Sequence, residues 1–252
     1  MIRKFIHIIF NPNSFLRIVL RFGFFSKRKN PVQYVYFRHG ILKLAACQKT
    51  DESGLPQKDI FELFPNIQSV SIQTKLSKGH AFNVSAEELQ IISAIVVYSK
   101  PQAIFEFGTF DGRTSYHMGL NAPSDCSIIT NDIQKGSFQF DNSLYNETIT
   151  IGGCFLNSDI SNRFISITGD SKKIDVSQYF GKVDIVFVDG DHSFEGVLSD
   201  SDLAFKLIKK NGLILWHDYN FVDGVTRALN ELNLKNYNIT QIKNTTLAIY
   251  KG

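Results

Sequence analysis

The sequence is poor in cysteine and lacks the long apolar runs of membrane proteins. Its 252 residues include three cysteines, Cys47, Cys126 and Cys154, an odd number without close spacing, which argues against a disulfide framework and against a zinc cluster. No stretch of about 20 uncharged apolar residues occurs, so a transmembrane helix is not expected. No small-residue cleavage site follows the apolar N-terminus, so a signal peptide is not expected either. These absences favour a cytoplasmic protein in a reducing compartment.

The sequence also lacks the two common glycine fingerprints for nucleotides. A dinucleotide fingerprint needs a second glycine two positions after the first, and Phe110 stands there after Gly108. A phosphate-binding P-loop needs Gly-Lys-Ser/Thr, which does not follow the turn. What is present is a tight turn between Gly108 and Gly112, directly after an apolar run. Glycine permits positive φ in such a turn and leaves room for an approaching ligand.

Acidic residues are absent from the first 50 positions. Ten Lys or Arg residues precede Asp51, and the rest of the chain has 17 basic and 24 acidic residues, a balance of −7. A basic arm of this kind suggests an anionic partner. One helical face between Phe15 and Phe22 is apolar, so we expect an amphipathic helix that packs on the body or on a second subunit, with peripheral membrane docking as the alternative. The acidic body is not expected to bind nucleic acid.

Strand-like apolar runs alternate with helical segments after residue 81. Ser85 and Glu88 form a capping box at the start of a helix that Pro101 ends, and further helices are expected at 114–120 and 193–210. The expected strands are 103–107, 127–130, 164–168, 184–188 and 213–216, then a terminal pair at 237–242 and 247–250. The alternation predicts an α/β fold with a parallel sheet. We expect residues 81–252 to form this domain and residues 1–80 to form a basic, helical and irregular N-terminal extension.

Ligand sites in such a sheet lie at the carboxyl ends of the strands, and polar residues follow several of the expected strands. Asp132, which is 26 residues after Glu106, can accept both hydroxyls of a ribose. Asp170 and Ser171 are placed to contact a base, although Asp170 could instead cap a turn. About thirty residues separate Asp132 from the strand at 164–168, which is long enough for a functional lid or for an ordinary surface excursion.

Two further motifs, 188–193 and 216–219, follow neighbouring strands and should converge. Together they bring three carboxylates, Asp189, Asp191 and Asp218, close to the imidazoles of His192 and His217. Such a group can hold a divalent cation or remove a proton from a hydroxyl. The structural alternative is that Asp191 or Ser193 caps a helix and that the backbone satisfies His217.

The order and spacing of these motifs resemble class I S-adenosylmethionine-dependent methyltransferases. The likeness is closest to the branch of small-molecule and sugar O-methyltransferases and cephalosporin-hydroxylase-like proteins, and it covers roughly residues 81–252. The motifs that carry it are Glu106-x-Gly108-x-x-x-Gly112-x-x-Ser115, Asp132, Gly169-Asp170-Ser171, Val188-Asp189-Gly190-Asp191-His192-Ser193-Phe194-Glu195 and Trp216-His217-Asp218-Tyr219. The resemblance implies a Rossmann-like, mostly parallel sheet of seven strands with the last strand antiparallel and helices on both faces.

The resemblance also implies how S-adenosylmethionine is held. Glu106 and the Gly108 turn would hold its amino-acid part, Asp132 its ribose, and Asp170 with Ser171 its adenine. The full set of expected cofactor-binding residues is Glu106, Gly108, Gly112, Ser115, Asp132, Asp170, Ser171 and Asp189.

Metal-dependent relatives bind magnesium through an acid after the fourth strand and an acid pair after the fifth. Asp189 and Asp218 match this pattern, whereas His217 replaces the first acid of the pair. Imidazole suits softer ions than Mg²⁺, so either the site works without a metal or Asp189, His217 and Asp218 take a different divalent ion.

The expected reaction is the methylation of a hydroxyl on a small molecule or a sugar, with Asp191 or His192 as the catalytic base. Two alternatives remain. The same scaffold could serve a dinucleotide-dependent oxidoreductase, or the chain could be an interaction protein with a vestigial cofactor site.

Overall fold

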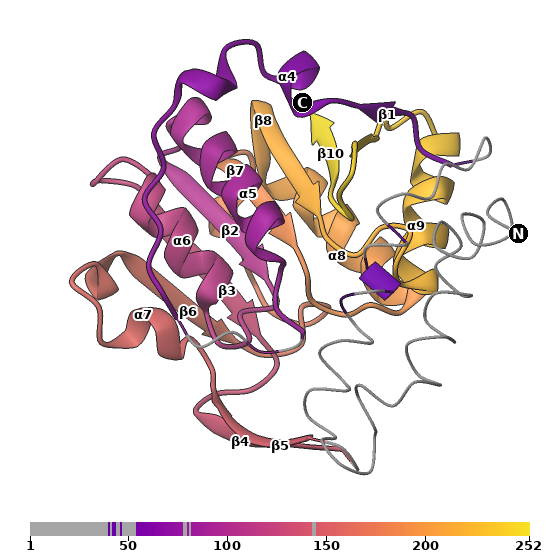
Figure 1. Ribbon diagram of the computed structural model, residues 1–252. Helices are drawn as coiled ribbons and strands as arrows, with labels where there is room; N and C mark the ends of the chain where they lie inside the picture. The colour runs from indigo at the N-terminus through magenta and orange to yellow at the C-terminus, as the bar shows by residue number, and fades with distance from the viewer. Residues whose placement is uncertain are drawn as a thin grey trace, which may run out of the picture.

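A mostly parallel sheet with helices on both faces organises the chain (Figure 1). The computed structural model describes residues 40, 42–43, 46, 54–77, 80, 82–142 and 145–252. The amphipathic helix expected between Phe15 and Phe22 lies outside these residues. Five neighbouring parallel strands start at one edge of the sheet and are, in spatial order, β6 (Phe164–Thr168), β3 (Ser127–Asp132), β2 (Ala103–Phe107), β7 (Val183–Val188) and β8 (Ile208–Trp216).

The far edge of the sheet contains the reversed strand that was expected. Strand β10 (Ala248–Lys251) runs antiparallel to both β8 and β9 (Thr240–Ile242). The sheet has eight strands rather than seven, because β1 (Gln57–Lys58) adds to β9 in parallel. Backbone bonds make this pairing: the Gln241 amide donates to the Pro56 carbonyl over 2.8 Å. A two-residue strand held by its backbone leaves no periodic pattern in the sequence.

Helices cover the sheet in two layers, each with its own apolar core. On one face, α5 (Ala86–Ser99) and α6 (Arg113–Asn121) pack against Ile104, Ile185 and Leu215. On the other, α8 (Phe194–Leu207) and α9 (Asp223–Leu234) pack against Phe105, Val186 and Ile214. The short helical elements are α4 (Ile60–Leu63), α7 (Gly153–Leu156), η1 (Ile67–Ser69), η2 (Ser161–Arg163) and η3 (Ser177–Tyr179). None of the described helices is long and apolar enough to cross a membrane.

Residues 55–70 belong to the same cores, although the sequence places them in the extension. Leu55 packs with the face of α8 and α9, while Leu63, Phe64 and Ile67 pack with the face of α5. The boundary near residue 80 stays a prediction from the sequence.

The capping box at α5 is confirmed. The Glu88 amide donates to Ser85 Oγ over 3.1 Å, and the Ser85 amide donates to Glu88 Oε2 over 3.2 Å. The expected end of the third helix is wrong by three residues. Helix α8 ends at Leu207, and Ile208 already pairs with Val183 in the sheet.

The long connection after Asp132 forms a two-stranded hairpin and a helical turn. Strands β4 (Ser137–Asn142) and β5 (Tyr145–Thr150) pair antiparallel in a sheet of their own. Figure 1 shows this hairpin projecting beyond the edge where the parallel strands end.

Trp216, the last residue of β8, is fully buried. Its indole Nε1 donates to Ser201 Oγ over 2.9 Å, which ties α8 to the sheet just before His217 and Asp218.

Candidate functional site

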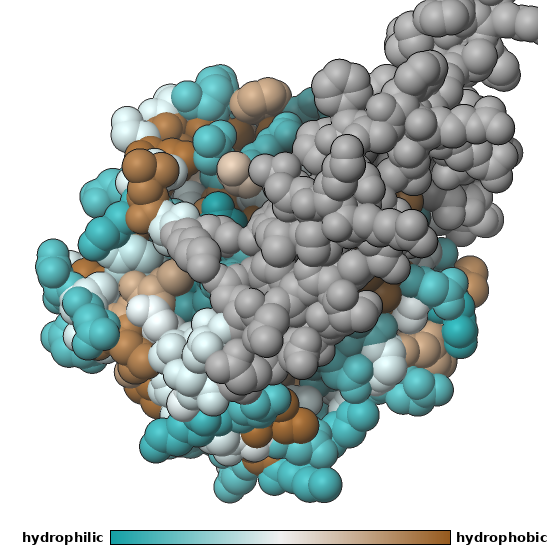
Figure 2. All heavy atoms as spheres, turned by 60° about the horizontal axis from the view of Figure 1, so that its bottom comes forward, coloured by the Kyte–Doolittle hydropathy of each residue, from teal (hydrophilic) through white to brown (hydrophobic). Residues whose placement is uncertain are grey.

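Two adjoining cavities lie along the carboxyl edge of the sheet. The first has a volume of about 340 Å³ and the second about 690 Å³. They share Gly108, Asp132 and Gly190, so they form one continuous cleft across the ends of β3, β2 and β7. Figure 2 turns this end of the molecule forward, and hydrophilic and hydrophobic side chains are interspersed over its coloured part. The cleft lies where the strand pattern predicts a ligand site.

The glycine turn between β2 and α6 is packed so closely that both glycines are required. Gly108 has a φ of +89°, and a Cβ there would lie 2.1 Å from the Asp189 carbonyl oxygen. Gly112 has a φ of +78°, and its Cβ would lie 2.7 Å from the Gly152 Cα. Phe110 itself has a φ of +47°, and its amide donates to Asp132 Oδ2 over 2.9 Å. The turn therefore fixes the Asp132 carboxylate at the junction of the two cavities.

Glu106 and Ser115 lie behind this turn and not on the wall of either cavity. Glu106 is fully enclosed, and the Ser115 hydroxyl donates to its carboxylate. Burial raises the pKa of Glu106 well above its usual range; the Ser115 bond opposes this, and the charges of Asp189, Asp111 and Asp132 add to it.

Asp111 is a site residue that the sequence analysis passed over, although it stands inside the quoted glycine motif. It lines the second cavity, and its Oδ1 accepts from Asn83 Nδ2 and from the Arg113 amide, each over 3.0 Å. His80 Nε2 lies 3.6 Å from its other oxygen. Burial raises the pKa of Asp111 despite these partners.

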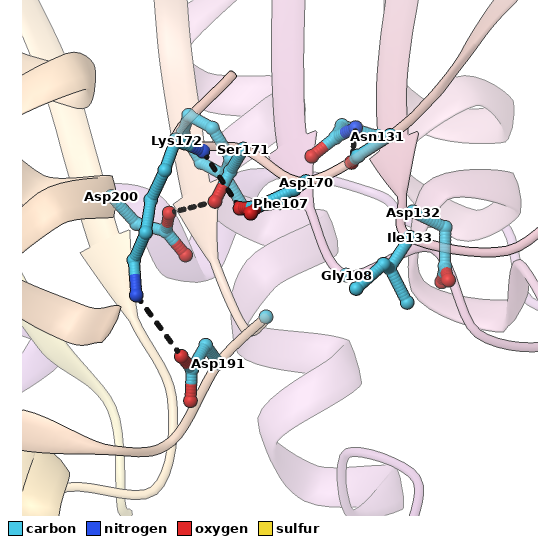
Figure 3. A pocket seen from close by; sticks show the side chains of 12 residues that line it. Phe107, Gly108, Asn131, Asp132, Ile133, Asp170, Ser171, Lys172, Asp191 and Asp200 are labelled. Atoms are coloured by element: carbon cyan, nitrogen blue, oxygen red, sulfur yellow. Dashed lines mark hydrogen bonds and ion pairs between the residues drawn. The ribbon is translucent and has the colours of Figure 1, made fainter. Parts of the chain in front are cut away.

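The first cavity contains the residues expected to hold a nucleoside (Figure 3). Asp132 lies on one side of it, and Asp170 and Ser171 lie on the opposite side. Asp170 Oδ1 accepts from the Lys172 amide over 3.0 Å, so this residue caps a turn as well as lining the cavity. Ser171 Oγ donates to Asp200 Oδ1 over 2.6 Å.

Asp191 also faces the first cavity, and not the second. Its Oδ1 accepts from the Ser193 amide over 2.9 Å, and its Oδ2 lies 3.7 Å from Lys172 Nζ (Figure 3). The Ser193 bond holds the pKa of Asp191 below its usual range. Ser193 rather than Asp191 caps the start of α8, because its Oγ accepts from the Gly196 amide over 3.1 Å. Asp191 holds the turn just before the helix, and it lies apart from the cavity that His192 lines.

Asp189, His192 and Asp218 come together on the wall of the second cavity. His192 Nε2 lies 3.4 Å from Asp189 Oδ1 and 3.3 Å from Asp218 Oδ2. Hydrogen bonds to the two carboxylates raise the pKa of His192 to about 10. Asp218 has a left-handed backbone with a φ of +64°, an uncommon conformation that aims its side chain at this group.

The expected metal set needs one correction, because His192 takes the place of His217. Among the described residues, one ligand atom each from Asp189, His192 and Asp218 lie within 4.8 Å of one another. His217 is 3% exposed and lies behind them. Its Nδ1 is 3.0 Å from Asp189 Oδ1, and its Nε2 is 2.7 Å from Lys43 Nζ, so both ring nitrogens are engaged. Neighbouring side chains satisfy this imidazole, rather than the backbone.

The geometry of this trio suits a divalent ion. Two carboxylates and one imidazole are ligands for such ions. Asp218 Oδ1 is buried and has no hydrogen-bond partner among the described residues. The residues present therefore fit a metal, although the sequence gives no sign that His192 rather than His217 would be the nitrogen ligand.

Comparisons with known proteins agree with the fold described above. A family described as a methyltransferase domain matches residues 105–219. A cofactor-bound protein from MTB is similar in structure, with a TM-score of 0.51 and 14% identity, over 69% of this chain and 83% of that chain. An O-methyltransferase from Bacillus cereus in complex with SAH has a TM-score of 0.50 and 14% identity, over 81% of this chain and 93% of that chain. An uncharacterised protein of Acanthamoeba polyphaga mimivirus is 43% identical over 37 residues, which are 15% of this chain and 17% of that protein.

Proposed function

We propose that the protein is a class I, S-adenosylmethionine-dependent methyltransferase that methylates a hydroxyl on a small molecule or a sugar. The match of residues 105–219 to a methyltransferase domain supports this proposal. The observation that carries the proposal is the position of Asp189, His192 and Asp218 on the second cavity, beside the glycine turn. A hydroxyl acceptor must lose a proton during attack, and this group can take it.

The two cavities would bind different parts of the cofactor and the acceptor. We assign the first cavity to the nucleoside of the cofactor, with Asp132 on the ribose and Asp170 and Ser171 near the base. The second cavity would hold the methionine end together with the acceptor. Its apolar walls are Leu42, Phe82, Val84, Phe110, Phe221 and Val222. A volume of about 690 Å³ in an apolar setting supports a small acceptor.

S-adenosylmethionine supplies an electrophilic methyl carbon on a sulfonium. The residues around the second cavity align the acceptor with it and exclude water, which lowers the entropic barrier to transfer. His192 is our candidate base in preference to Asp191, because Asp191 faces the other cavity. His192 holds a proton between Asp189 and Asp218, so it must lose that proton before it can accept another. Turnover is therefore expected to rise with pH until the imidazole is neutral.

The cluster of Asp189, His192 and Asp218 could also bind a divalent ion. Asp189, His192 and Asp218 would hold it, and the ion would lower the pKa of an acceptor hydroxyl. In that case His192 would be a ligand and not the base.

Calorimetry with SAH and with NADH, followed by transfer of labelled methyl groups to hydroxyl-bearing metabolites and glycans, tests the proposal. We expect wild type to bind SAH and not NADH, and Asp132→Ala to weaken SAH binding by about tenfold or more. His192→Gln should keep SAH binding and lose methyl transfer, whereas Asp191→Ala should retain most transfer. Binding of NADH instead of SAH would favour the oxidoreductase, and binding of SAH without transfer to any acceptor would favour a vestigial site.

A further inference from the structure

Lys43 comes from the segment before the methyltransferase domain, yet it lies in the middle of the site. It is 7% exposed. Its ammonium is 2.7 Å from His217 Nε2, 3.1 Å from Glu88 Oε2 and 3.7 Å from Asp218 Oδ1. Leu42, the residue before it, lines the second cavity. The ammonium therefore lies between the ring nitrogen of His217 and the carboxylates of Glu88 and Asp218.

Glu88 provides a fixed anchor for this lysine. Its Oε1 accepts from the Thr246 amide over 2.8 Å and from the Thr246 hydroxyl over 2.6 Å. Its Oε2 accepts from the amide and the hydroxyl of Ser85, as part of the capping box of α5. With both oxygens engaged, the Glu88 carboxylate cannot turn away from Lys43.

Asp218 is held from the opposite direction. Its Oδ1 faces Lys43, while its Oδ2 faces His192 at 3.3 Å. The side chains thus form a continuous chain from Glu88 through Lys43 and Asp218 to His192. A buried carboxylate without a cation is strongly unfavourable, so Lys43 compensates charge that lies directly behind the second cavity.

We propose that Lys43 is a positioning residue that acts as a built-in cation of the acceptor site. Its ammonium orients the Asp218 carboxylate toward His192 and lowers the affinity of Asp189, His192 and Asp218 for a divalent ion. The consequence for turnover rests on the proposed function, whereas the effect on ion binding does not. Lys43 is then part of the active site, although the sequence places it in the N-terminal extension.

The test uses full-length protein, with Mn²⁺ followed by electron paramagnetic resonance and SAH by calorimetry. Lys43→Met should bind Mn²⁺ at least tenfold more tightly than wild type, because a positive charge near Asp218 has been removed. Lys43→Arg should remain within about threefold of wild type, because the charge is restored. Lys58→Met, which changes an exposed lysine of β1, is the matched control and should not differ from wild type. Adding Asp218→Asn to Lys43→Met should remove the gain.

A folded Lys43→Met protein that binds SAH normally but binds Mn²⁺ no more tightly than wild type overturns the proposal, and so does Mn²⁺ binding by neither protein. If Lys43→Met does not fold, Lys43→Gln decides by the same measurement, because glutamine keeps hydrogen bonding without the charge. A wild-type protein that does not bind SAH would contradict the proposed function, while the Mn²⁺ comparison would still decide the role of Lys43.

Discussion

Glu106 should make the protein less stable than a neutral side chain would, and the replacement Glu106→Gln tests this. The carboxyl group is fully enclosed, and its burial raises its pKa well above 4.5. In the unfolded chain the group ionises near pH 4.5, while in the folded protein it keeps its proton to a higher pH. Above pH 4.5 the folded state therefore binds more protons than the unfolded state, and its stability falls as pH rises toward the folded pKa.

The size of the effect follows from proton linkage. Each pH unit between the unfolded and the folded pKa lowers the free energy of unfolding by about 1.4 kcal/mol. Glutamine is neutral in both states and can still accept the Ser115 bond, so it avoids this loss. Glu106→Gln should equal wild type near pH 4.5 and become more stable than wild type as pH rises from there toward the folded pKa of Glu106. For a chain of this length, 1 kcal/mol raises Tm by about 2–4 °C.

Urea denaturation at pH 5, 6, 7 and 8 measures this difference, with SAH calorimetry alongside. We expect stability to rise. SAH binding should fall about tenfold or more if the Glu106 anion pairs with the cofactor's amino group, as the family resemblance implies, because an amide cannot ionise. Glu87→Gln, which changes an exposed glutamate of α5, should alter stability by less than about 0.5 kcal/mol. A gap between Glu106→Gln and wild type that stays constant or shrinks with pH would refute the reasoning.

Two further predictions concern the turn and the histidine. Gly108→Ala should abolish SAH binding or folding, because its Cβ would lie 2.1 Å from a backbone oxygen. The control Gly136→Ala should cost only about 1–2 kcal/mol of stability, because Gly136 also has a positive φ, +84°, but has nothing within 4 Å of the added Cβ. Equal losses of thermal stability in the two variants would contradict this account. His192 has a raised pKa of about 10, so the stability it contributes is complete below pH 6.5 and disappears as pH approaches 10. Denaturation curves of His192→Gln should lose less stability than wild type between pH 6.5 and 10, and parallel losses would count against the ion pairs with Asp189 and Asp218.

The central sheet could be predicted because its strands are buried on both faces. The run from Val183 to Val188 is apolar except for Asp184 for this reason, whereas the reversal of β10 was expected only from the family resemblance. Strands β4 and β5 pair with each other outside the main sheet, so they lack the continuous apolar run by which a buried strand can be predicted. The end of α8 was placed too late because Ile208 continues the helical pattern while its backbone already pairs with Val183.

The site was predictable where residues follow regular strands and less so where they lie in loops. Gly108, Asp132 and Asp170 could be placed because each lies at the end of a strand or within two residues after it. Asp191 and His192 are neighbours in an irregular segment, and nothing in the sequence indicates that they face different cavities.

The positions of His217 and Lys43 in the site could not be predicted from the sequence. The left-handed backbone of Asp218 turns the chain, so that His217 points behind the cavity wall. Lys43 is 174 residues away from His217, and no local pattern connects them. The sequence shows only that the segment before Asp51 is basic, which suggested an external anionic partner rather than buried carboxylates of the same chain.

The position of Trp216 has a practical consequence. It is the one tryptophan of the 252 residues, and its buried indole lies one residue before His217, against the Phe205 ring. Indole emission shifts to longer wavelengths when the ring becomes exposed to water. The chain therefore carries a single intrinsic fluorophore between the core and the cleft, whose spectrum follows unfolding without a label and whose intensity can report on charge changes around His217.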